Sequence, residues 1–272
     1  MDLIRINTTT CRKCGVCAAT CPGGLIDFPP QSFPKAGEMA EVACTRCGHC
    51  VAVCPTASLS HRDMSIEACT AIQAYYRITP EQVEQFLRSR RSIRAYKNQP
   101  VPRELTKRII EIARYAPTGH NNQNVEWMVI DSPDQIKHLE RVGADWMRWM
   151  KRQNIPAAPG LDLDRMLDRQ EANYNTLLRD APVVIITHDA RNPLGAVDSS
   201  IALTYLDLAA NSLGLGCCWA GMIMMMAKSF PPMQEALLLP PGHEAQGVMM
   251  MGYPRFTYQR LPARKPPKII WH

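Results

Sequence analysis

The sequence predicts an α+β protein in two parts: a short cysteine-rich module over residues 1–60 and a larger layered α+β domain over residues 79–272. Three observations support this division. A run of four cysteines occurs twice near the amino end, a strong helix-start signal stands at Thr79, and short apolar runs then alternate with helical patterns. Strands and helices that pack as separate layers define an α+β architecture. Residues 61–78 are expected to form the connector.

The cysteine run is an internal duplication. Its copies read CRKCGVCAATCP and CTRCGHCVAVCP, and the second follows the first at a constant offset of 33 residues. Both have the pattern C-x2-C-x2-C-x3-C-P, which contains Cys11, Cys14, Cys17, Cys21, Cys44, Cys47, Cys50 and Cys54. Two-residue gaps let a short loop wrap three thiolates around one face of a metal cluster, and Gly15 and Gly48 let the backbone come close.

This spacing resembles that of bacterial-type two-cluster ferredoxins, in which the fourth cysteine of each run reaches across to the other cluster. The resemblance implies two [4Fe-4S] clusters. Their ligand sets would be Cys11, Cys14, Cys17 and Cys54 for one, and Cys44, Cys47, Cys50 and Cys21 for the other. Zinc is the alternative metal, but four-cysteine zinc sites do not explain a third cysteine, a trailing proline and the whole pattern twice. The other three cysteines are expected to be small buried residues: Cys69, Cys217 and Cys218.

The second domain begins with a helix. Thr79 and Gln82 form a capping box, with Pro80 at the first helical position. Residues 102–116 predict an amphipathic helix, and residues 132–150 predict another. The apolar face of the 102–116 helix consists of Leu105, Ile109, Ile112, Ala113 and Ala116.

Strands are expected where short apolar runs are bounded by turn residues, at 126–131, 182–189 and 247–254. Residues 199–214 predict a helix that is apolar nearly all round. Such a helix is usually buried. We therefore expect a buried central helix packed against a mixed sheet.

A basic segment, RSRRSIRAY, follows the first helix of this domain. If it leaves the helix in extended form, Arg90, Ser92 and Arg94 project to one side. Two guanidinium groups and a hydroxyl then make an anion site of phosphate size. A solvated basic helix end is the alternative for this segment taken alone.

The order of the motifs resembles that of nitroreductase-family flavoproteins. RRSIRAY, APTGHNNQNVEWMVI, LGLGCCWAG and a GYP followed by a basic tail occur in the family's order over roughly residues 79–272. The whole chain resembles the subgroup that carries an N-terminal two-cluster ferredoxin module. This resemblance implies a nitroreductase-like α+β layered domain that binds FMN.

The resemblance also implies FMN contacts, residue by residue. The segment that contacts the phosphate and the pyrimidine end matches Arg90, Arg91, Ser92 and Arg94. The polar pair of the second segment matches Asn121 and Gln123. The segment that lies along the ring and supplies a backbone N–H near flavin N5 matches Trp219, Ala220 and Gly221. The basic segment that closes on the phosphate matches Arg264, with Arg260 or Lys265 as alternatives.

The expected function is an FMN-dependent oxidoreductase that passes electrons through two clusters and FMN to an electron-poor organic acceptor: a nitroaromatic, a quinone or an activated alkene. The flavin carries the chemistry, so no catalytic side chain is required. Fused clusters favour ferredoxin or a similar one-electron donor, with NAD(P)H as the alternative. The resemblance implies a homodimer with FMN at its interface, and residues 145–180 are expected to cover the flavin. The alternative function is a non-catalytic electron relay or redox sensor.

Bulk composition excludes several classes. A hydrophobic content of 46% argues against disorder. The formal net charge of +6 would be cancelled by two thiolate-ligated clusters and a flavin phosphate, so no nucleic-acid partner is inferred. No apolar run approaches the roughly 20 residues of a membrane span, and no export signal precedes the cysteines. We expect a cytoplasmic protein with no membrane partner, in which disulfides are disfavoured.

Overall fold

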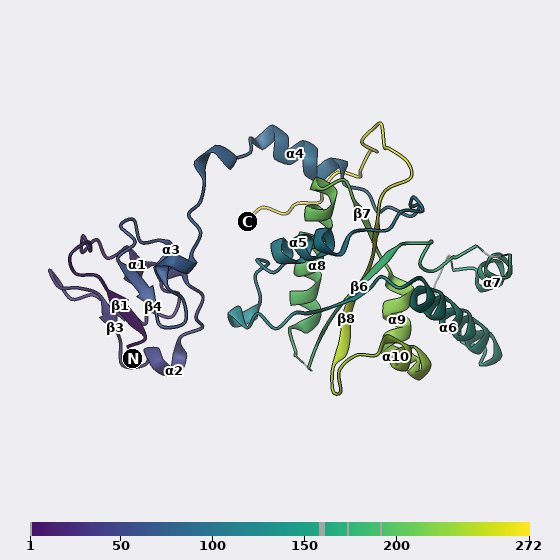
Figure 1. Ribbon diagram of the computed structural model, residues 1–272, viewed down its shortest axis with the longest axis horizontal. Helices are drawn as coiled ribbons and strands as arrows, with labels where there is room; N and C mark the ends of the chain where they lie inside the picture. The colour runs from purple at the N-terminus through teal and green to yellow at the C-terminus, as the bar shows by residue number, and fades with distance from the viewer. Residues whose placement is uncertain (1, 158–160, 173, 191) are drawn as a thin grey trace. The chain divides into compact units, whose positions relative to one another are not determined.

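The computed structural model describes residues 2–157, 161–172, 174–190 and 192–272. By its contacts the chain divides into two compact units, drawn in Figure 1. The first runs to Ile78 and also includes His120–Asn122. The second consists of Thr79–Gly119 and Gln123–His272. Each unit has its own buried core.

The first unit contains two small antiparallel sheets. Its strands pair as β1 with β4 and as β2 with β3. Three short helices connect them, and two 3-10 turns follow. The elements are β1 (Ile4–Ile6), α1 (Val16–Ala19), β2 (Ile26–Asp27), β3 (Lys35–Ala36), α2 (Ala40–Ala43), α3 (His49–Ala52), β4 (Leu59–His61), η1 (Ile66–Ala68) and η2 (Ala74–Tyr76). Its core is small: the buried apolar residues Ile4, Val51 and Leu59 form one cluster.

The duplication in the sequence is also a duplication in the structure. α1 and α3 occupy equivalent positions in the two cysteine runs. Each begins after a glycine in the left-handed conformation, Gly15 with φ 72° and Gly48 with φ 73°. A side chain is strained there, so glycine lets each run turn back on itself. Lys13 and Arg46 also match, with φ values of 53° and 54°.

The second unit is built on a four-stranded sheet with the order β5-β6-β8-β7. Its strands are β5 (Glu126–Ile130), β6 (Val183–Asp189), β7 (Gly216–Trp219) and β8 (Glu244–Gly252). All three pairings are antiparallel, so the prediction of a mixed sheet is wrong. The reason is topological. β6 and β7 run in the same direction on either side of a helical connection, but β8 inserts between them and pairs antiparallel with both.

Helices cover both faces of this sheet. α5 (Arg103–Ala113) packs on α8 (Gly195–Ser212), and α8 packs on the sheet. The other face carries α9 (Gly221–Ser229), which packs with α10 (Pro231–Leu237) and α6 (Pro133–Arg152). Outside these layers, α7 (Leu163–Glu171) contacts α6, and α4 (Pro80–Ser89) begins the unit.

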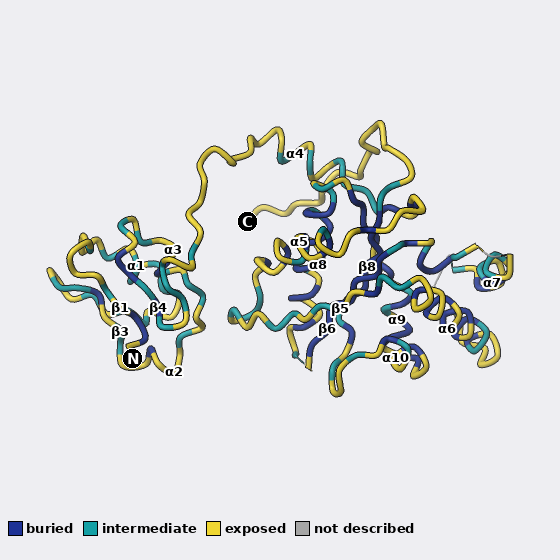
Figure 2. Tube along the Cα trace, in the orientation of Figure 1, coloured by how far each residue is buried: buried dark blue, intermediate teal, exposed yellow. Residues whose placement is uncertain are grey.

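Side chains that alternate in direction along the strands explain why helices cover both faces of the sheet. In β6, Val183 and Ile185 belong to the core on the α8 face, whereas Val184 and Ile186 belong to the core on the α6 and α9 face. Successive side chains of a strand point to opposite faces, so a strand that is buried throughout, as β6 is, needs a covering layer on each side. Figure 2 shows this sheet as the most deeply buried part of the second unit.

The capping box at the start of α4 is confirmed. Gln82 N donates to Thr79 Oγ1 at 3.2 Å, and Thr79 N donates to Gln82 Oε1 at 2.8 Å. Such reciprocal bonds satisfy donors that the first helical turn otherwise leaves free. The predicted buried central helix corresponds to α8, which is apolar nearly all round.

Two predictions about apolar residues need correction. Ile112 of α5 is 43% exposed, so its assignment to the core face is wrong. The buried stripe of α5 is narrower than predicted and contains Thr106, Ile109 and Ala113. In the stretch 145–180, expected to cover the flavin, Trp146 is only 2% exposed and belongs to the core. The first part of that stretch is therefore core, because α6 packs against α9 and α10.

Among the residues that the structure describes, no helix combines the length and apolar character that crossing a bilayer requires.

Candidate functional site

Two cavities in the first unit are lined by cysteines of both runs. One has a volume of about 260 Å³, and its cysteines are Cys21, Cys44, Cys47 and Cys50. The other has a volume of about 20 Å³, and its cysteines are Cys11, Cys14, Cys17 and Cys54. Each cavity therefore receives three cysteines from one run and the fourth from the other. No disulfide joins these residues, all of which are free thiols.

Two thiols in these cavities, Cys17 and Cys50, have a raised pKa, whereas the pKa of Cys54 is lowered because hydrogen bonds from Ser58 and Thr56 outweigh the effect of its burial. The pKa of Cys50 is raised to about 11, mainly by burial and to a smaller extent by the nearby Cys47 and Cys21. Burial also raises the pKa of Cys17, with a smaller contribution from Cys54. A bound metal removes the proton from a coordinating thiol and offsets the repulsion between thiolates. The chemistry of this donor set therefore fits a metal cluster.

Backbone N–H groups point at the sulfur atoms in both copies. Leu25 N donates to Cys21 Sγ at 3.3 Å, and Ser58 N donates to Cys54 Sγ at 3.2 Å. The two donors are related by the same sequence offset as the cysteines. Hydrogen bonds to ligand sulfurs hold their orientation and stabilise the negative charge of a cluster.

Two side chains also contact cysteine sulfurs: Thr56 Oγ1 lies 3.9 Å from Cys54 Sγ, and His61 lies next to Cys44. His61, only 4% exposed, places Nε2 at 3.8 Å from Cys44 Sγ. Its Nδ1 accepts a hydrogen bond from Asp63 N at 3.1 Å. Because Nδ1 is the acceptor, the ring proton lies on Nε2, so His61 donates to the sulfur. Sequence reasoning missed His61, which lies outside both runs in the three-residue strand β4, and no local motif marks it.

In the second unit, the basic segment after α4 is extended and lies against β7. Ile93 N donates to Cys217 O at 2.9 Å. Gly216 and Gly252 face each other in the sheet at this point. A Cβ on Gly216 would lie 2.2 Å from Ile93 Cγ1, so only glycine lets the segment come this close. The segment is therefore extended, which is the conformation that puts the side chains of Arg90, Ser92 and Arg94 on one side. It is not a continuation of the α4 helix end.

Arg90 is anchored by a buried carboxylate. Its Nη1 donates to Asp207 Oδ2 of α8 at 3.2 Å, and the Asp207 side chain is 9% exposed. Burial raises the pKa of Asp207, and the Arg90 charge opposes this rise. The ion pair between Arg90 and Asp207 therefore attaches the segment to α8.

Ser92 and Arg94 lie around the Cys218 thiol on β7. The Cys218 thiol donates to Trp219 O at 3.6 Å. Burial raises the pKa of Cys218, whereas the charges of Arg94 and Arg179 lower it. The Ser92 side chain also lowers this pKa. The structure therefore adds Arg179, which sequence reasoning missed, to the basic group near β7. No local motif marks Arg179, since only the fold brings it near the 90–94 segment.

Arg91 carries a buried orphan donor. Its Nη2 donates to Arg88 O, while its Nε is buried without a hydrogen-bond partner among the described residues. A buried N–H group without a partner is costly and often marks a position that a ligand completes.

The ring-contact segment continues from β7 into α9. Trp219 is 41% exposed and Ala220 is buried. The Ala220 N–H donates to Val248 O at 2.9 Å, so it is occupied by the sheet. Gly221 opens α9, and a Cβ built on it would meet nothing within 4 Å. The first N–H groups of a helix have no partner inside the helix, which makes the Gly221 N–H the accessible donor of this segment.

The two polar residues of the second expected segment lie in a strained loop. Asn121 has φ 55° and Gln123 has φ 49°, and His120 between Gly119 and Asn121 has φ 53°. Such conformations cost energy in non-glycine residues and concentrate at functional sites. The boundary between the two units falls within this loop, with Asn121 grouped with the first unit and Gln123 with the second.

Arg264 lies in an extended C-terminal stretch. Residues 255–272 are all exposed, including Arg260 and Lys265. Within one chain, Arg264 is therefore not enclosed with the other residues expected to contact FMN.

The fold and the two cysteine cavities define the class of protein: an α+β layered domain fused to an iron–sulfur module. Residues 87–253 match the nitroreductase family, and residues 10–58 match a 4Fe-4S dicluster domain. The family match spans most of the chain, so the chain belongs to the nitroreductase family.

Similar proteins include flavin and pyridine-nucleotide enzymes. An FMN reductase [NAD(P)H] from Bacillus subtilis is 27% identical over 187 residues, which cover 68% of this chain and 71% of that protein. An NADH dehydrogenase from Thermus thermophilus is 27% identical over 199 residues, covering 67% of this chain and 92% of that protein. A Bacteroides fragilis nitroreductase with bound FMN aligns with a TM-score of 0.55 at 21% identity, covering 69% and 95% of the two chains. This structural likeness establishes the fold.

Proposed function

We propose that this protein is an FMN-dependent oxidoreductase in which two [4Fe-4S] clusters pass electrons to FMN for the reduction of an electron-poor organic acceptor. The observation that carries the proposal is the presence of a dicluster domain and a nitroreductase domain in one chain. Similar proteins named for FMN and NAD(P)H support the redox class. Nitroaromatics, quinones and activated alkenes are the proposed acceptors.

The proposed cluster ligands follow from the cysteine cavities. Cys11, Cys14, Cys17 and Cys54 hold one cluster; Cys44, Cys47, Cys50 and Cys21 hold the other. Each cavity is lined by three cysteines of one run and the fourth cysteine of the other, which supports this ligand assignment. Because the apolar core of the first unit is small, the clusters contribute much of its folding free energy.

The proposed FMN contacts group around β7. Arg94 and Ser92, with Arg179, offer positive charge and a hydroxyl for the phosphate or the pyrimidine end. Arg91 offers its orphan Nε, and Arg90 positions the segment through Asp207. The Gly221 N–H, next to Trp219 and Ala220, is the proposed donor toward N5. Asn121, Gln123 and Arg264 complete the proposed set.

Bound FMN supplies electron transfer to the acceptor, and the side chains around it bind, orient and shield it. Ferredoxin or a similar one-electron carrier is the proposed donor, because two fused clusters accept electrons singly. NAD(P)H is the competing donor, and the names of the similar enzymes favour it.

A homodimer completes the proposed FMN site. On α8, Val197 is 56% exposed and Tyr205 is 40% exposed, with the half-buried Ile201 and Leu208 on the same side. A helix that is apolar nearly all round is usually covered on every side. An exposed apolar face of this kind marks an interaction surface. A second copy is the proposed cover, and it would bring a second exposed C-terminal stretch with Arg264.

The test is anaerobic turnover by iron-replete, FMN-loaded protein with defined donors and acceptors. Reduced ferredoxin is compared with NADH and NADPH, and product is counted per flavin. We expect many turnovers of a nitroaromatic or a quinone with reduced ferredoxin. If NAD(P)H reduces the flavin rapidly and reduced ferredoxin does not, the proposal that electrons reach FMN through the clusters is wrong. Reduction that stops at one flavin equivalent with every acceptor would favour the relay or sensor over an enzyme.

A further inference from the structure

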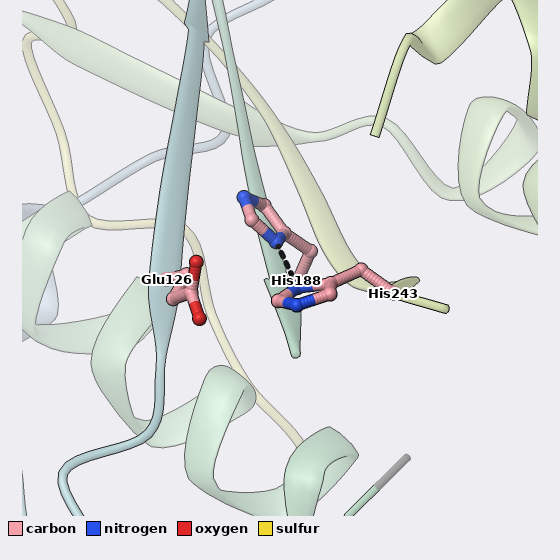
Figure 3. Close-up of side chains that lie close together, drawn as sticks. All are labelled: Glu126, His188 and His243. Carbon is pink, nitrogen blue, oxygen red and sulfur yellow. Dashed lines mark hydrogen bonds between the residues drawn. The ribbon is translucent and has the colours of Figure 1, made fainter. Parts of the chain in front are cut away.

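Three side chains with metal-binding atoms meet at one end of the second unit's sheet (Figure 3). They are Glu126 from β5, His188 from β6 and His243 from the turn before β8. One ligand atom from each lies within 4.8 Å of the other two. None of the three is among the residues expected to bind iron or FMN.

The sheet itself brings these residues together. Glu126 and His188 are cross-strand partners in the β5–β6 ladder, which puts their side chains on the same face about 5 Å apart. The β6–β8 register shifts between Thr187 and His188. A bulge bends its strand and redirects the side chains beside it. His243 stands just before β8, whose first residues pair with this end of β6.

The two imidazoles are arranged like metal ligands. His188 Nδ1 and His243 Nδ1 are 2.9 Å apart, and His188 is only 4% exposed. With bonds of about 2.0–2.1 Å to one ion, this separation corresponds to an N–metal–N angle of about 90°. A tetrahedral angle needs about 3.3 Å, so the rings would separate by only a few tenths of an ångström. Glu126 is exposed and can change rotamer to bring its carboxylate closer.

We propose that Glu126, His188 and His243 bind one divalent transition-metal ion, Zn²⁺ in type, through one carboxylate oxygen and two imidazole nitrogens. Three protein ligands leave a fourth position for water. The ion links β5, β6 and the turn before β8, so it clamps one end of the sheet. The competing account is a hydrogen bond between two neutral imidazoles with no metal. This site is independent of the proposed oxidoreductase function.

The experiment uses the whole 272-residue chain, cluster-loaded, under anaerobic conditions and dialysed against buffered Zn²⁺. His243→Gln and Glu126→Gln each remove one proposed ligand. His138→Gln is the matched control, because His138 is an exposed imidazole on α6 outside the cluster. Bound zinc is measured by elemental analysis, and its ligands by X-ray absorption at the zinc edge.

We expect one zinc per chain with only N and O neighbours at about 2.0–2.1 Å in the wild type and in His138→Gln. His243→Gln should weaken zinc binding by on the order of 100-fold, and Glu126→Gln by at least about tenfold. Equal zinc binding by His243→Gln and His138→Gln would overturn the proposal. So would a wild-type shell of sulfur at about 2.3 Å, which would place the zinc on cluster cysteines. Unchanged circular dichroism confirms that the variants are folded.

Discussion

A single buried imidazole distinguishes the two cysteine cavities. The side-chain group next to Cys44 is the His61 imidazole, whereas the one next to Cys54 is the Thr56 hydroxyl; backbone donors are found in both copies. Hydrogen bonds to ligand sulfur stabilise the reduced, more negative cluster. The two proposed clusters therefore have different surroundings despite the duplicated sequence.

Replacing His61 by Leu should lower the reduction potential of the proposed Cys44 cluster. The His61 hydrogen bond stabilises the reduced cluster more than the oxidised one. If this difference in free energy is about 1 kcal/mol, its loss shifts the one-electron potential by roughly 40 mV. Redox titration followed by electron paramagnetic resonance measures the shift. His49→Gln is the control, since His49 is an exposed imidazole on the same cavity. Equal potentials in the two variants would show that the His61 donor has no influence.

Glu140 of α6 is a buried carboxyl group with a raised pKa. It is 2% exposed, and its Oε1 accepts from Leu178 N. Burial raises the pKa of Glu140 to about 6 from an ordinary 4.5. The native state therefore holds this proton more tightly than the unfolded chain, and stability falls as pH rises from about 4.5 to about 6.

The Glu140→Gln variant should remove this pH dependence. The neutral amide keeps an acceptor for Leu178 N without a buried charge. We expect the variant to be more stable than the wild type by up to about 2 kcal/mol at pH 7, with the gain vanishing near pH 4.5. Urea unfolding followed by tryptophan fluorescence at several pH values measures this, because Trp146 is buried in the same helix. A constant difference across this range would contradict the assignment.

At the scale of elements, the repeated cysteine run determines which positions share a cavity. The fourth cysteine of each run follows a four-residue helix, α1 or α3, that carries it into the cavity of the other run. The two cavities are therefore coupled through the backbone. Loss of one ligand should affect one proposed cluster first.

Cys14→Ser should abolish or degrade one iron–sulfur centre and leave flavin content largely unchanged. A serine hydroxyl is a poor substitute for a thiolate at an iron site. Iron and sulfide analysis with electron paramagnetic resonance measures the loss. Cys69→Ser is the control, because the Cys69 thiol donates to Ser65 O at 3.4 Å and lines neither cysteine cavity. Iron content equal to that of the control would show that the ligand assignment is wrong.

At the scale of the whole molecule, exposed apolar side chains outside the buried cores indicate an interaction surface. The outer side of α8 carries Val197 and Tyr205, and Ile112 is exposed on α5, which packs beside it. At the carboxyl end, Ile270 and Trp271 are 82% and 86% exposed. The proposed cover for both surfaces is a second copy of the chain.

Tyr205→Asp should convert the proposed dimer to a monomer and reduce FMN retention. A charge placed in a desolvated interface has no partner and costs several kcal/mol. Sedimentation velocity gives the oligomeric state, and absorbance gives the flavin content. Tyr75→Asp is the control, since Tyr75 is 74% exposed in the first unit. A wild-type protein that is monomeric with FMN bound would contradict the proposed interface.

Local patterns were enough to predict much of this protein. The cysteine spacing, the capping box of Thr79 and Gln82, and the strand that begins with the apolar run 183–186 depend on neighbours close in sequence, where spacing translates directly into geometry. The family resemblance added the expected flavin segments.

Contacts between distant segments were decided only by the tertiary structure. His61 beside Cys44, and Glu126 beside His188 and His243, join side chains that no short pattern relates, and Arg179 is near enough to Cys218 for its charge to lower the pKa of that thiol. The antiparallel sheet likewise depends on where β8 inserts, and the exposure of Ile112 depends on how far α8 covers α5. A sequence pattern states which residues need burial or a partner, but packing in three dimensions decides which partner each one meets.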